Sequence, residues 1–420
     1  MRVAHLLRKY DPSEWGGTET GVKRLLDGLL YHNVHPIIFC PRTKVPPSHD
    51  PLVESGYEVK RFKACVPVWG ISGEQKKLLI SVGGNILSFD LIWLLLREKN
   101  IALIHSHTGN RLGGIALTVA KIRRLPLVLT IHGGVLDLPQ SARDYLSKPL
   151  QGGFEWGKFF GAPLRSRRVI EEADAIITNN KKEADLLGKK YPSKRIMVQP
   201  HSVPAEVYQK DHREKARAAF PQISGRQILL IMGRIDPVKN QSWVIEQAPA
   251  IFKKFPNALL VLAGSCTDAA YGEKIKKLIL EKGLEERVLL TGGLPPEDPK
   301  LIGLLQEAQI VFLPSLSETF GLVILEAWAA GNTVISSRTS GAQEMIREGE
   351  NGWLFDLENP AQFHAALETV LSKPDLRLQY AANGAAAVLK YYDTNVLGGR
   401  VKKLYEELIE TKNEIRHSAR

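Results

Sequence analysis

Two glutamates, Glu318 and Glu326, stand eight residues apart around a turn in the second half of the chain. The residues just before them, 310–314, form a short β-branched apolar run that ends in proline, which predicts a buried parallel strand. From Gly321 onward the apolar spacing becomes helical. We therefore place Glu318 on the loop after a strand and Glu326 about one turn into the next helix, on the face opposite Leu322.

This position of the two carboxylates suits a ligand that carries both phosphate and hydroxyl groups. Open α/β sheets bind ligands at the carboxyl ends of their strands. A helix start at this place exposes the amides of Phe320, Gly321 and Leu322, which favours an anion or hydroxyl oxygens. Because two carboxylates are unexpected beside phosphate alone, a sugar nucleotide fits better. The alternative is that Glu318 only complements the helix dipole and Glu326 is a solvated helix residue.

A second candidate group opens the second half, where Gly233 directly follows an apolar run. Glycine at the end of a strand allows a ligand to approach the backbone closely. Arg234 and Lys239 lie in the same predicted loop, and a guanidinium together with an ammonium can hold a diphosphate. Small-residue turns after the next two runs contain Gly264 and Leu294 and could receive a flat base, with ordinary tight turns as the alternative.

The elements that position these residues alternate between short β-like runs and helical stretches, which predicts parallel sheets covered by helices. The same alternation of strands and helices begins again in the second half, so we predict an α/β protein with two Rossmann-like domains. The domains are placed at 1–206 and 207–390, with a closing helix at about 391–415 that packs back onto the first. Strands are expected at 3–7, 36–40, 102–107, 127–132, 175–178, 196–199, 228–232, 258–263, 288–291, 310–313 and 333–336.

Length and composition limit the class of protein. A chain of 420 residues with 44% hydrophobic and 24% charged residues is long enough for two globular domains. Its three cysteines are widely spaced and form no disulfide framework, which indicates a reducing compartment. The first apolar run is too short for a signal peptide. The stretch 78–96 contains Asp90, whose charge costs on the order of 3 kcal/mol in a bilayer, so we expect a cytoplasmic protein.

The excess positive charge lies entirely in the first half. Residues 1–206 hold 30 Lys and Arg against 19 Asp and Glu, whereas 207–420 hold 26 of each. This suggests an anionic partner or surface, with a solvated basic face as the alternative. Arg123, Arg124 and 165–168 could anchor the protein peripherally at the inner face of an anionic membrane. No aromatic-interleaved basic stretch supports a nucleic-acid partner.

Together these motifs resemble the retaining glycosyltransferases of family 4, which have the GT-B fold. The resemblance implies two Rossmann-like domains that face each other across a cleft. It also implies transfer of a hexose-type sugar from a nucleotide diphosphate sugar to a glycan or lipid-linked acceptor, in the synthesis of cell-surface polysaccharide or another glycoconjugate. The motifs extend over nearly the whole chain: Gly16-Gly17, the stretch 171–178, Gly233-Arg234-x4-Lys239, the run 314–331, and 341–344 with 350–355.

The resemblance also implies a role for each candidate residue. Arg234 and Lys239 would bind the donor diphosphate and stabilise the leaving nucleotide. Glu326 would hold the ribose hydroxyls, and Glu318 those of the transferred sugar. His132, at the end of a predicted strand, would lie beside that sugar. The remaining candidate donor contacts are glycines and backbone amides, at Gly16, Gly17, Gly233, Gly264, Leu294, Phe320, Gly321 and Leu322.

The other histidines carry weaker signals. His107 is a candidate for acceptor binding. The chain has Gln199–Pro204 where the family has Asn-Gly-Val-Asp, which makes His201 a second acceptor candidate, with a hinge role as the alternative. A zinc site of His105, His107 and His132 is a further alternative, although no motif supplies a sulfur or carboxylate partner for these histidines. No Asp-x-Asp sequence occurs, so we expect no metal and no other cofactor.

Two rival functions are kept. A sugar-nucleotide epimerase or another GT-B sugar-phosphate enzyme would share the phosphate chemistry, and incubation with donor and acceptor would separate it from a transferase. A basic nucleic-acid-binding protein is the remote alternative, which a salt-dependent DNA shift assay would test. The Gly16-Gly17 pair lacks the Gly-x-Gly-x-x-Gly order of dinucleotide-binding enzymes.

Overall fold

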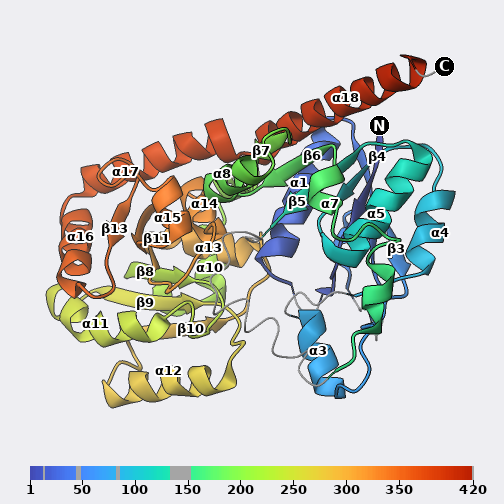
Figure 1. Cartoon of the computed structure of the whole chain (residues 1–420). Helices are drawn as coiled ribbons and strands as arrows, with labels where there is room; N and C mark the ends of the chain where they lie inside the picture. The colour runs from blue at the N-terminus through green and yellow to red at the C-terminus, as the bar shows by residue number, and fades with distance from the viewer. Residues whose placement is uncertain (13–14, 44–48, 82–85, 133–152, 419–420) are drawn as a thin grey trace. The chain divides into compact units, whose positions relative to one another are not determined.

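The chain forms two compact units in a computed structural model that describes residues 1–12, 15–43, 49–81, 86–132 and 153–418. The first unit is Met1–Pro200 with Leu397–Arg420, and the second is His201–Val396 (Figure 1). The division precedes the expected boundary at residue 206 because the intervening residues bond within the second unit. The Val203 amide donates to the Tyr392 carbonyl over 2.9 Å, and Thr394 Oγ1 lies 3.2 Å from Ser202 Oγ.

The first unit is built on a seven-stranded, all-parallel sheet with the order β3-β2-β1-β4-β5-β6-β7. Its strands are β1 (Arg2–Leu6), β2 (His35–Pro41), β3 (Glu58–Phe62), β4 (Ile101–Ser106), β5 (Leu127–Ile131), β6 (Ala175–Thr178) and β7 (Ile196–Val198). Its helices are α1 (Gly17–Tyr31), α2 (Pro51–Glu54), α3 (Gly73–Ser81), α4 (Asp90–Arg97), α5 (Asn110–Arg123), η3 (Trp156–Phe160), α7 (Val169–Glu172) and α8 (Lys181–Lys190).

Strand β3 is not among the predicted strands. Glu58, Lys60 and Arg61 interrupt its apolar pattern, and the strand forms the edge of the sheet. An edge strand tolerates such charges because one side of its ladder faces no neighbouring strand. The pairing with β2 that defines β3 is a tertiary contact, so its pattern alone does not indicate a strand.

The C-terminal helix α18 (Thr394–Ser418) belongs to the first unit from Leu397 onward. Apolar side chains on one of its faces join a buried cluster with β1, β4, β5 and β6: Val401, Leu404, Tyr405 and Leu408. Gly398 of α18 meets Gly28 of α1 backbone to backbone. A Cβ on Gly398 would overlap the Gly28 carbonyl group, so this helix can only approach α1 so closely with glycine at that point.

The second unit is built on a six-stranded parallel sheet with the order β10-β9-β8-β11-β12-β13. Its strands are β8 (Gln227–Met232), β9 (Ala258–Ala263), β10 (Val288–Gly292), β11 (Ala308–Leu313), β12 (Thr333–Ser337) and β13 (Trp353–Phe355). The three-residue β13 was not predicted, because so short a run has no period to detect. The helices are α9 (Ala205–Gln209), α10 (Arg213–Ala219), η4 (Pro221–Ile223), α11 (Gln241–Lys254), α12 (Ala269–Glu281), α13 (Pro299–Glu307), α14 (Leu322–Ala329), α15 (Ser340–Met345), α16 (Pro360–Ser372), α17 (Pro374–Ala387) and η5 (Val388–Tyr392).

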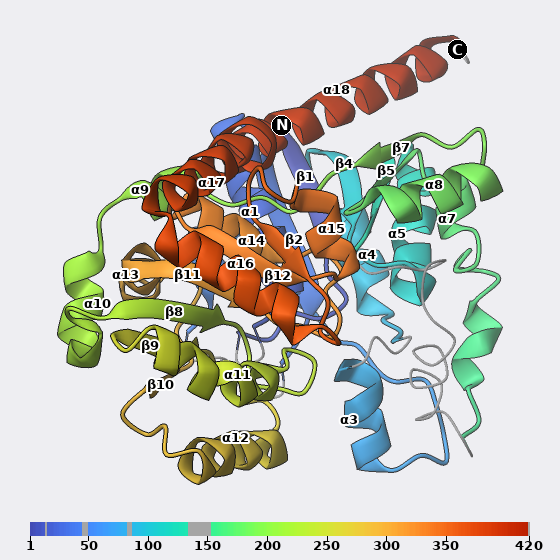
Figure 2. The same ribbon diagram turned by 90° about the vertical axis from the view of Figure 1, so that its left-hand side faces the viewer.

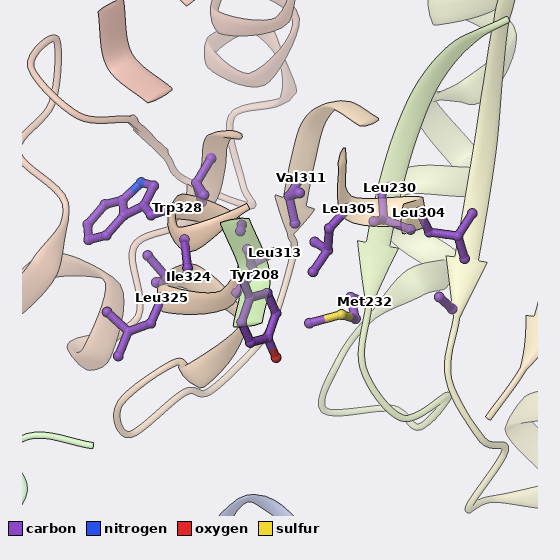
Figure 3. Close-up of a cluster of buried hydrophobic side chains, with 14 of the residues drawn as sticks. Tyr208, Leu230, Met232, Leu304, Leu305, Val311, Leu313, Ile324, Leu325 and Trp328 are labelled. Atoms are coloured by element: carbon purple, nitrogen blue, oxygen red, sulfur yellow. The ribbon is translucent and has the colours of Figure 1, made fainter. Parts of the chain in front are cut away.

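Helices cover both faces of the second sheet. Residues of α11, α12 and α16 pack with one set of strand side chains, and residues of α10, α13 and α14 pack with the alternate set. Figure 2 shows α11 and α16 on the near side of this sheet. Figure 3 shows part of the other cluster, in which Leu230 and Val311 of neighbouring strands lie near Leu304 and Leu305. The prediction of two helix-covered parallel sheets is confirmed.

The membrane-length stretch 78–96 is divided between elements. It contains the end of α3 and most of α4, while 82–85 lie outside the described residues. Within the ranges given above, no helix combines the length and the apolar character needed to cross a bilayer.

The backbone contact between α18 and α1 generates a test. Gly398→Val should destabilise the first unit by about 1–3 kcal/mol, because an inserted side chain forces packed backbones apart. We expect thermal unfolding of the full chain to occur several degrees lower. Gly399→Ala is the matched control, since its Cβ would meet only the movable His32 ring at 3.0 Å. Equal melting temperatures for the two variants would contradict this account.

Candidate active site

The strand order of the second unit reverses between β8 and β11, which are hydrogen-bonded neighbours. The chain leaves β8 toward α11 and β11 toward α14. Open α/β sheets bind ligands at such a switch point, beyond the carboxyl ends of the strands. The loops 233–240 and 314–321 both begin there, and they contain six of the predicted donor-site residues: Gly233, Arg234, Lys239, Glu318, Phe320 and Gly321.

Hydrogen bonds and an ion pair join these two loops. The Leu316 amide donates to the Val238 carbonyl over 2.8 Å, and Asn240 Nδ2 donates to the Pro314 carbonyl over 3.2 Å. Lys239 Nζ forms an ion pair with Glu318 Oε2, and each side chain is 20% exposed. The structure therefore brings together Lys239 and Glu318, which are 79 residues apart in sequence. An ammonium and a carboxylate lie side by side at the end of the sheet.

Asp236 holds the basic loop and was not predicted. Its carboxylate lies 3.2 Å from the Arg234 guanidinium and accepts from the Lys239 amide over 3.0 Å. Asp236 is 10% exposed, whereas Arg234 is 58% exposed. The buried acid thus orients an exposed guanidinium. The sequence shows an acid two residues after Arg234. It does not show that the Asp236 carboxylate turns back toward Arg234 and the Lys239 amide.

Glu326 is buried within α14, with 7% of its surface exposed. The reading of Glu326 as a solvated helix residue is therefore wrong. The expected face is also wrong: α14 begins at Leu322, and four helical residues advance by about 400°, so Glu326 lies on the same side as Leu322. A carboxylate in this position is largely shielded from bulk water.

The turn before α14 has a conformation that requires glycine. Gly321 has φ +89°, in the left-handed region. Among the described residues, the amides of Phe320, Gly321 and Leu322 donate to no backbone acceptor. The turn is braced by α15, where the Gly341 amide donates to the Glu318 carbonyl over 2.9 Å. The helix start therefore offers amides that no backbone carbonyl of the described residues is shown to occupy.

Gly341 belongs to the quoted family motif 341–344 but was given no role, and Ser340 directly precedes that motif. Ser340 Oγ donates to the Glu318 carbonyl over 3.1 Å, and a Cβ on Gly341 would collide with the Phe320 backbone. Both residues therefore support the backbone of the Glu318 loop. No sequence signal identified this contact, because it joins the loops that follow β11 and β12.

Packing accounts for the two predicted donor glycines at the ends of β8 and β9. A Cβ on Gly264 would overlap the Gly233 carbonyl. Their amides are also occupied, since Gly233 donates to Ala263 over 2.9 Å and Gly264 donates to Gly292 over 3.0 Å. Leu294 is half-buried against the apolar cluster of the second unit. These residues shape the rim of the sheet, and neither glycine amide is available for a ligand.

Gly16 and Gly17 begin helix α1 after β1, at the corresponding position of the first sheet. Gly16 is the N-cap residue, and its amide donates to Glu19 Oε2 over 3.1 Å. The Gly16 carbonyl accepts from the Thr20 amide over 3.0 Å. Glu19 thus supplies one half of a capping box at this helix start, and glycine has no side chain to supply the other half.

Four histidines of the first unit gather where its own strand order reverses, between β1 and β4. His5 Nδ1 lies 3.0 Å from His107 Nε2, and His107 Nδ1 lies 2.9 Å from His132 Nε2. His105 Nδ1 lies 2.5 Å from Tyr405 Oη, and its Nε2 lies 2.6 Å from Thr130 Oγ1. His107 and His132 are therefore in contact. His5 was missed, although a histidine inside an apolar strand is an available signal.

The hydrogen bonds of this cluster bear on the zinc alternative. His5, His105 and His107 offer nitrogens within 4.8 Å of one another. Both nitrogens of His105 and both of His107 already face hydrogen-bond partners. A metal would have to displace those bonds, so the cluster fits hydrogen bonding better than metal coordination. The sequence suggested His105, His107 and His132 as zinc ligands. The three histidines whose nitrogens lie closest together include His5 in place of His132.

His201 lies in the second unit and is not part of the histidine cluster. Its ring packs edge-on against Phe320, with 5.1 Å between centroids and 80° between planes. Phe320 also lies edge-on to Tyr392, at 6.5 Å. The residue that follows the unit boundary therefore contacts the Glu318 loop directly.

Comparisons with known proteins agree with this geometry. Residues 15–207 match the description "Glycosyltransferase Family 4", and residues 212–387 match "Glycosyl transferases group 1". The fold is similar to that of Anabaena HepE in complex with UDP, with a TM-score of 0.70 at 17% identity over 97% of this chain and 100% of the other. It is also similar to sucrose-phosphate synthase of Thermosynechococcus elongatus, with a TM-score of 0.70 at 22% identity over 98% and 99%. The family matches, together with the fold, define a GT-B glycosyltransferase.

Curated relatives extend along the whole chain. A D-inositol 3-phosphate glycosyltransferase of Corynebacterium glutamicum is 26% identical over 98% of this chain and 98% of its own. The α-D-kanosaminyltransferase of Streptomyces kanamyceticus is 26% identical over 87% of this chain and 94% of its own. The protein belongs to the family 4 glycosyltransferases, as its motifs indicated.

The buried histidines predict how stability depends on pH. Burial lowers the pKa of His5 to about 3 and that of His132 to about 4, and it lowers the pKa of His105 and His107 as well. The histidines of the unfolded chain take up protons below about pH 6.5, whereas the native rings do not. The free energy of unfolding should therefore decrease as the pH is lowered below about 6.5. Each such group contributes a slope of up to about 1.4 kcal/mol per pH unit.

Urea unfolding at pH 7.5, 6.0 and 5.0 measures this dependence. His5→Leu should make the dependence shallower by about one proton, whatever its effect at pH 7.5. Val3→Ala, in the same strand and also buried, is the control and should lower stability equally at each pH. An unchanged pH dependence in His5→Leu would show that His5 titrates normally in the native state.

Proposed function

We propose that this glycosyltransferase transfers a hexose-type sugar from a nucleotide diphosphate sugar to a hydroxyl group of a glycan or lipid-linked acceptor, with retention of anomeric configuration. The observation that carries the proposal is the contact of Lys239 with Glu318 at the switch point of the second sheet. Lys239 is a cation suited to a diphosphate, and Glu318 is an acid suited to sugar hydroxyls. A nucleotide diphosphate sugar carries both groups next to each other, so it needs both residues at one place. Anabaena HepE has been solved with UDP and with UDP-glucose, which makes these compounds the first probes.

The role of each site residue in donor binding follows from its charge and its burial. Lys239 and Arg234 bind the diphosphate, with the Arg234 fork held by Asp236. Amides of Phe320, Gly321 and Leu322 add donors at the start of α14. Glu326 accepts from the ribose hydroxyls, and its burial suits a role as a fixed acceptor. Glu318 leaves its partner Lys239 to the phosphate and receives hydroxyls of the transferred sugar.

Retention needs no strongly basic side chain in this scheme. The departing phosphate takes the acceptor's proton as the glycosidic bond opens, on the same face of the sugar. Arg234 and Lys239 stabilise the charge that develops on the leaving diphosphate, where preorganised positive groups act most effectively. With these two cations in place, we propose that transfer proceeds without a metal ion or another cofactor.

The acceptor is proposed from the charge of the first half. Residues 1–206 carry the whole excess of basic residues, which favours an anionic glycan or a lipid-linked pyrophosphate at the inner face of a membrane. A role in cell-surface polysaccharide or other glycoconjugate synthesis is consistent with such an acceptor. His107 is buried and bonded on both sides, so we assign it no direct contact with the acceptor.

Two substitutions separate the roles of Lys239 and Glu318. Lys239→Ala should weaken UDP binding at least tenfold, because a diphosphate loses a charge-assisted partner. Glu318→Gln should bind UDP as well as wild type or better, since a carboxylate beside the phosphate site is removed. Both variants should lose transfer from the sugar nucleotide by at least a hundredfold. Calorimetric titration with UDP and product analysis with UDP-glucose and candidate acceptors measure these effects.

Lys254→Ala is the matched control. Lys254 forms an ion pair with Glu368 in the same unit, but both side chains are about half exposed and lie on α11 and α16. Its loss should change neither binding nor transfer. Full transfer by folded Lys239→Ala or Glu318→Gln would refute the proposed site. Release of an epimerised nucleotide sugar without transfer would favour the epimerase alternative.

A further inference from the structure

Six aromatic rings of the first unit form an unbroken row of contacts, which we call the aromatic row. Successive ring centroids lie 5.3 to 6.4 Å apart, within the range of favourable aromatic pairs. In order along the row, the rings are those of Phe159, Phe154, Trp69, Trp156, Phe160 and Phe89. They come from the loop after β3, the start of α4 and the segment that contains η3. The row is therefore assembled by the tertiary structure.

Much of the aromatic row is exposed to solvent. Four of its members have more than half of their surface exposed: Trp69, Phe89, Phe154 and Phe159. Trp93 extends this surface, because it lies four residues after Phe89 on the same face of α4 and is also more than half exposed. Arg97 Cζ lies 5.8 Å from the centroid of the Trp93 ring. An apolar surface of this extent marks an interaction site.

The backbone beneath the row is braced by hydrogen bonds. Trp69 and Phe154 exchange two backbone hydrogen bonds of 2.9 Å each. Arg111 Nε donates to the Gly157 carbonyl over 2.9 Å, and its guanidinium forms an ion pair with Glu155. Arg111 is buried, so this ion pair is shielded from solvent. An ordered scaffold therefore presents the exposed rings, and their exposure does not result from a loose segment.

The charges beside the row suit an anionic partner. Glu155, the acid within the row, is paired with Arg111. Asp90 accepts two hydrogen bonds, from a neighbouring hydroxyl over 2.7 Å and from a backbone amide over 2.9 Å. The cations Lys158 and Arg97 are exposed, and Lys158 lies 3.7 Å from the already neutralised Glu155. The surface therefore offers apolar rings and accessible positive charge.

These features favour a lipid surface over the other possible occupants. Tryptophan and phenylalanine beside basic side chains are the residues that hold a protein at a membrane–water interface. A glycan needs precisely placed polar groups, but both acids of this surface are already bonded. A second copy of the chain would bring the same cations together, and like charges repel.

We propose that the aromatic row, together with Trp93, is a docking surface for an anionic lipid bilayer. The exposed rings enter the interfacial layer, while Lys158 and Arg97 stay beside the headgroup phosphates. Docking itself does not depend on the identity of the sugar donor. Its use in reaching a lipid-linked acceptor rests on the proposed function.

This surface differs from the anchor suggested by the arginine pair at Arg123 and Arg124. That pair ends α5 just before β5, and Arg123 Nη1 donates to the Leu95 carbonyl over 2.7 Å. It therefore lies at the amino edge of the first sheet. The loop after β3 and the start of α4 lie at the carboxyl edge, where α/β sheets bind ligands. Docking through the row brings the bilayer to the ligand-binding edge of the unit.

Co-sedimentation with lipid vesicles tests the proposal. The full chain is mixed, without nucleotide, with vesicles of phosphatidylcholine alone or of equal amounts of phosphatidylcholine and phosphatidylglycerol. We expect binding to the anionic vesicles and weaker binding at high salt, because salt screens the attraction of the cations. Failure to bind anionic vesicles at low salt would overturn the proposal.

Substitution of exposed rings locates the contact. Trp69→Ser/Phe159→Ser should weaken vesicle binding at least about tenfold, because two rings no longer enter the interface. Ile122→Ser/Leu280→Ser is the matched control, since it removes two similarly exposed apolar side chains outside the row. The melting temperature should stay unchanged in both. Phe159→Ser alone should weaken binding about threefold, which covers a double variant that does not fold. Equal binding by the row variants and the control would overturn the proposal.

Charge reversal separates the row from the arginine pair. Lys158→Glu should weaken binding to the anionic vesicles at least about fivefold, the effect of one basic residue near the surface. It should leave any binding to phosphatidylcholine vesicles unchanged. Arg124→Glu should change neither. A larger loss in Arg124→Glu than in Lys158→Glu would move the contact to the end of α5 and overturn the proposal.

Two further measurements test the other occupants. Tryptophan emission of the wild-type protein should shift to the blue with anionic vesicles and should not respond to maltohexaose, a soluble oligosaccharide. A response to maltohexaose without a response to vesicles would assign the row to a glycan. Sedimentation velocity should show no association that Trp69→Ser/Phe159→Ser abolishes, since such association would assign the row to a second copy. Either result would overturn the proposal. Because nucleotide is absent throughout, a failure of sugar transfer leaves the docking result standing, and a failure of docking leaves the proposed donor site standing.

Discussion

The candidate site depends on one constraint, the close approach of two loops that leave neighbouring parallel strands in opposite directions. Because β8 and β11 are adjacent and their helices diverge, the loops after them meet at the end of the sheet. The Leu316 amide and the Val238 carbonyl join the two backbones, and Lys239 and Glu318 join their side chains. This backbone contact fixes the distance between the partly buried Lys239 ammonium and Glu318 carboxylate. Gly321 and Gly341 belong to the same arrangement, since each allows a backbone conformation or approach that a side chain would prevent.

The first unit uses its switch point differently. Its polar groups there are neutral imidazoles, all drawn to low pKa values by burial. Neutral rings can be buried if their nitrogens are satisfied, and most of these nitrogens face one another or a hydroxyl group. One of the hydroxyls comes from Tyr405 in α18. The C-terminal helix thereby completes both the apolar packing of the first sheet and the hydrogen bonding of His105.

Much of the fold could be predicted because the strands of a parallel sheet, covered on both faces, are continuous apolar runs. Strands such as β6 and β9 begin and end where their apolar runs do. The edge strand β3 was missed because its charges are tolerated only where no further strand pairs with it. The candidate site was predicted in part: motif spacing identified Lys239, Glu318 and Glu326. The burial of Glu326, the anchoring Asp236 and the packing of Gly264 against Gly233 depend on neighbours that are distant in sequence.

The amino-acid sequence by itself determined the class of fold, the number of sheets and the residue types available for chemistry, since these follow from local periodicity and from motifs along the chain. Only the tertiary structure decided which of those residues meet. Lys239 and Glu318 form a pair because strand order places their loops together. His5, whose apolar strand does not reveal its partner, joins His107 because β1 and β4 are neighbours. Contacts between strands depend on pairing order, and pairing order is a property of the folded chain as a whole.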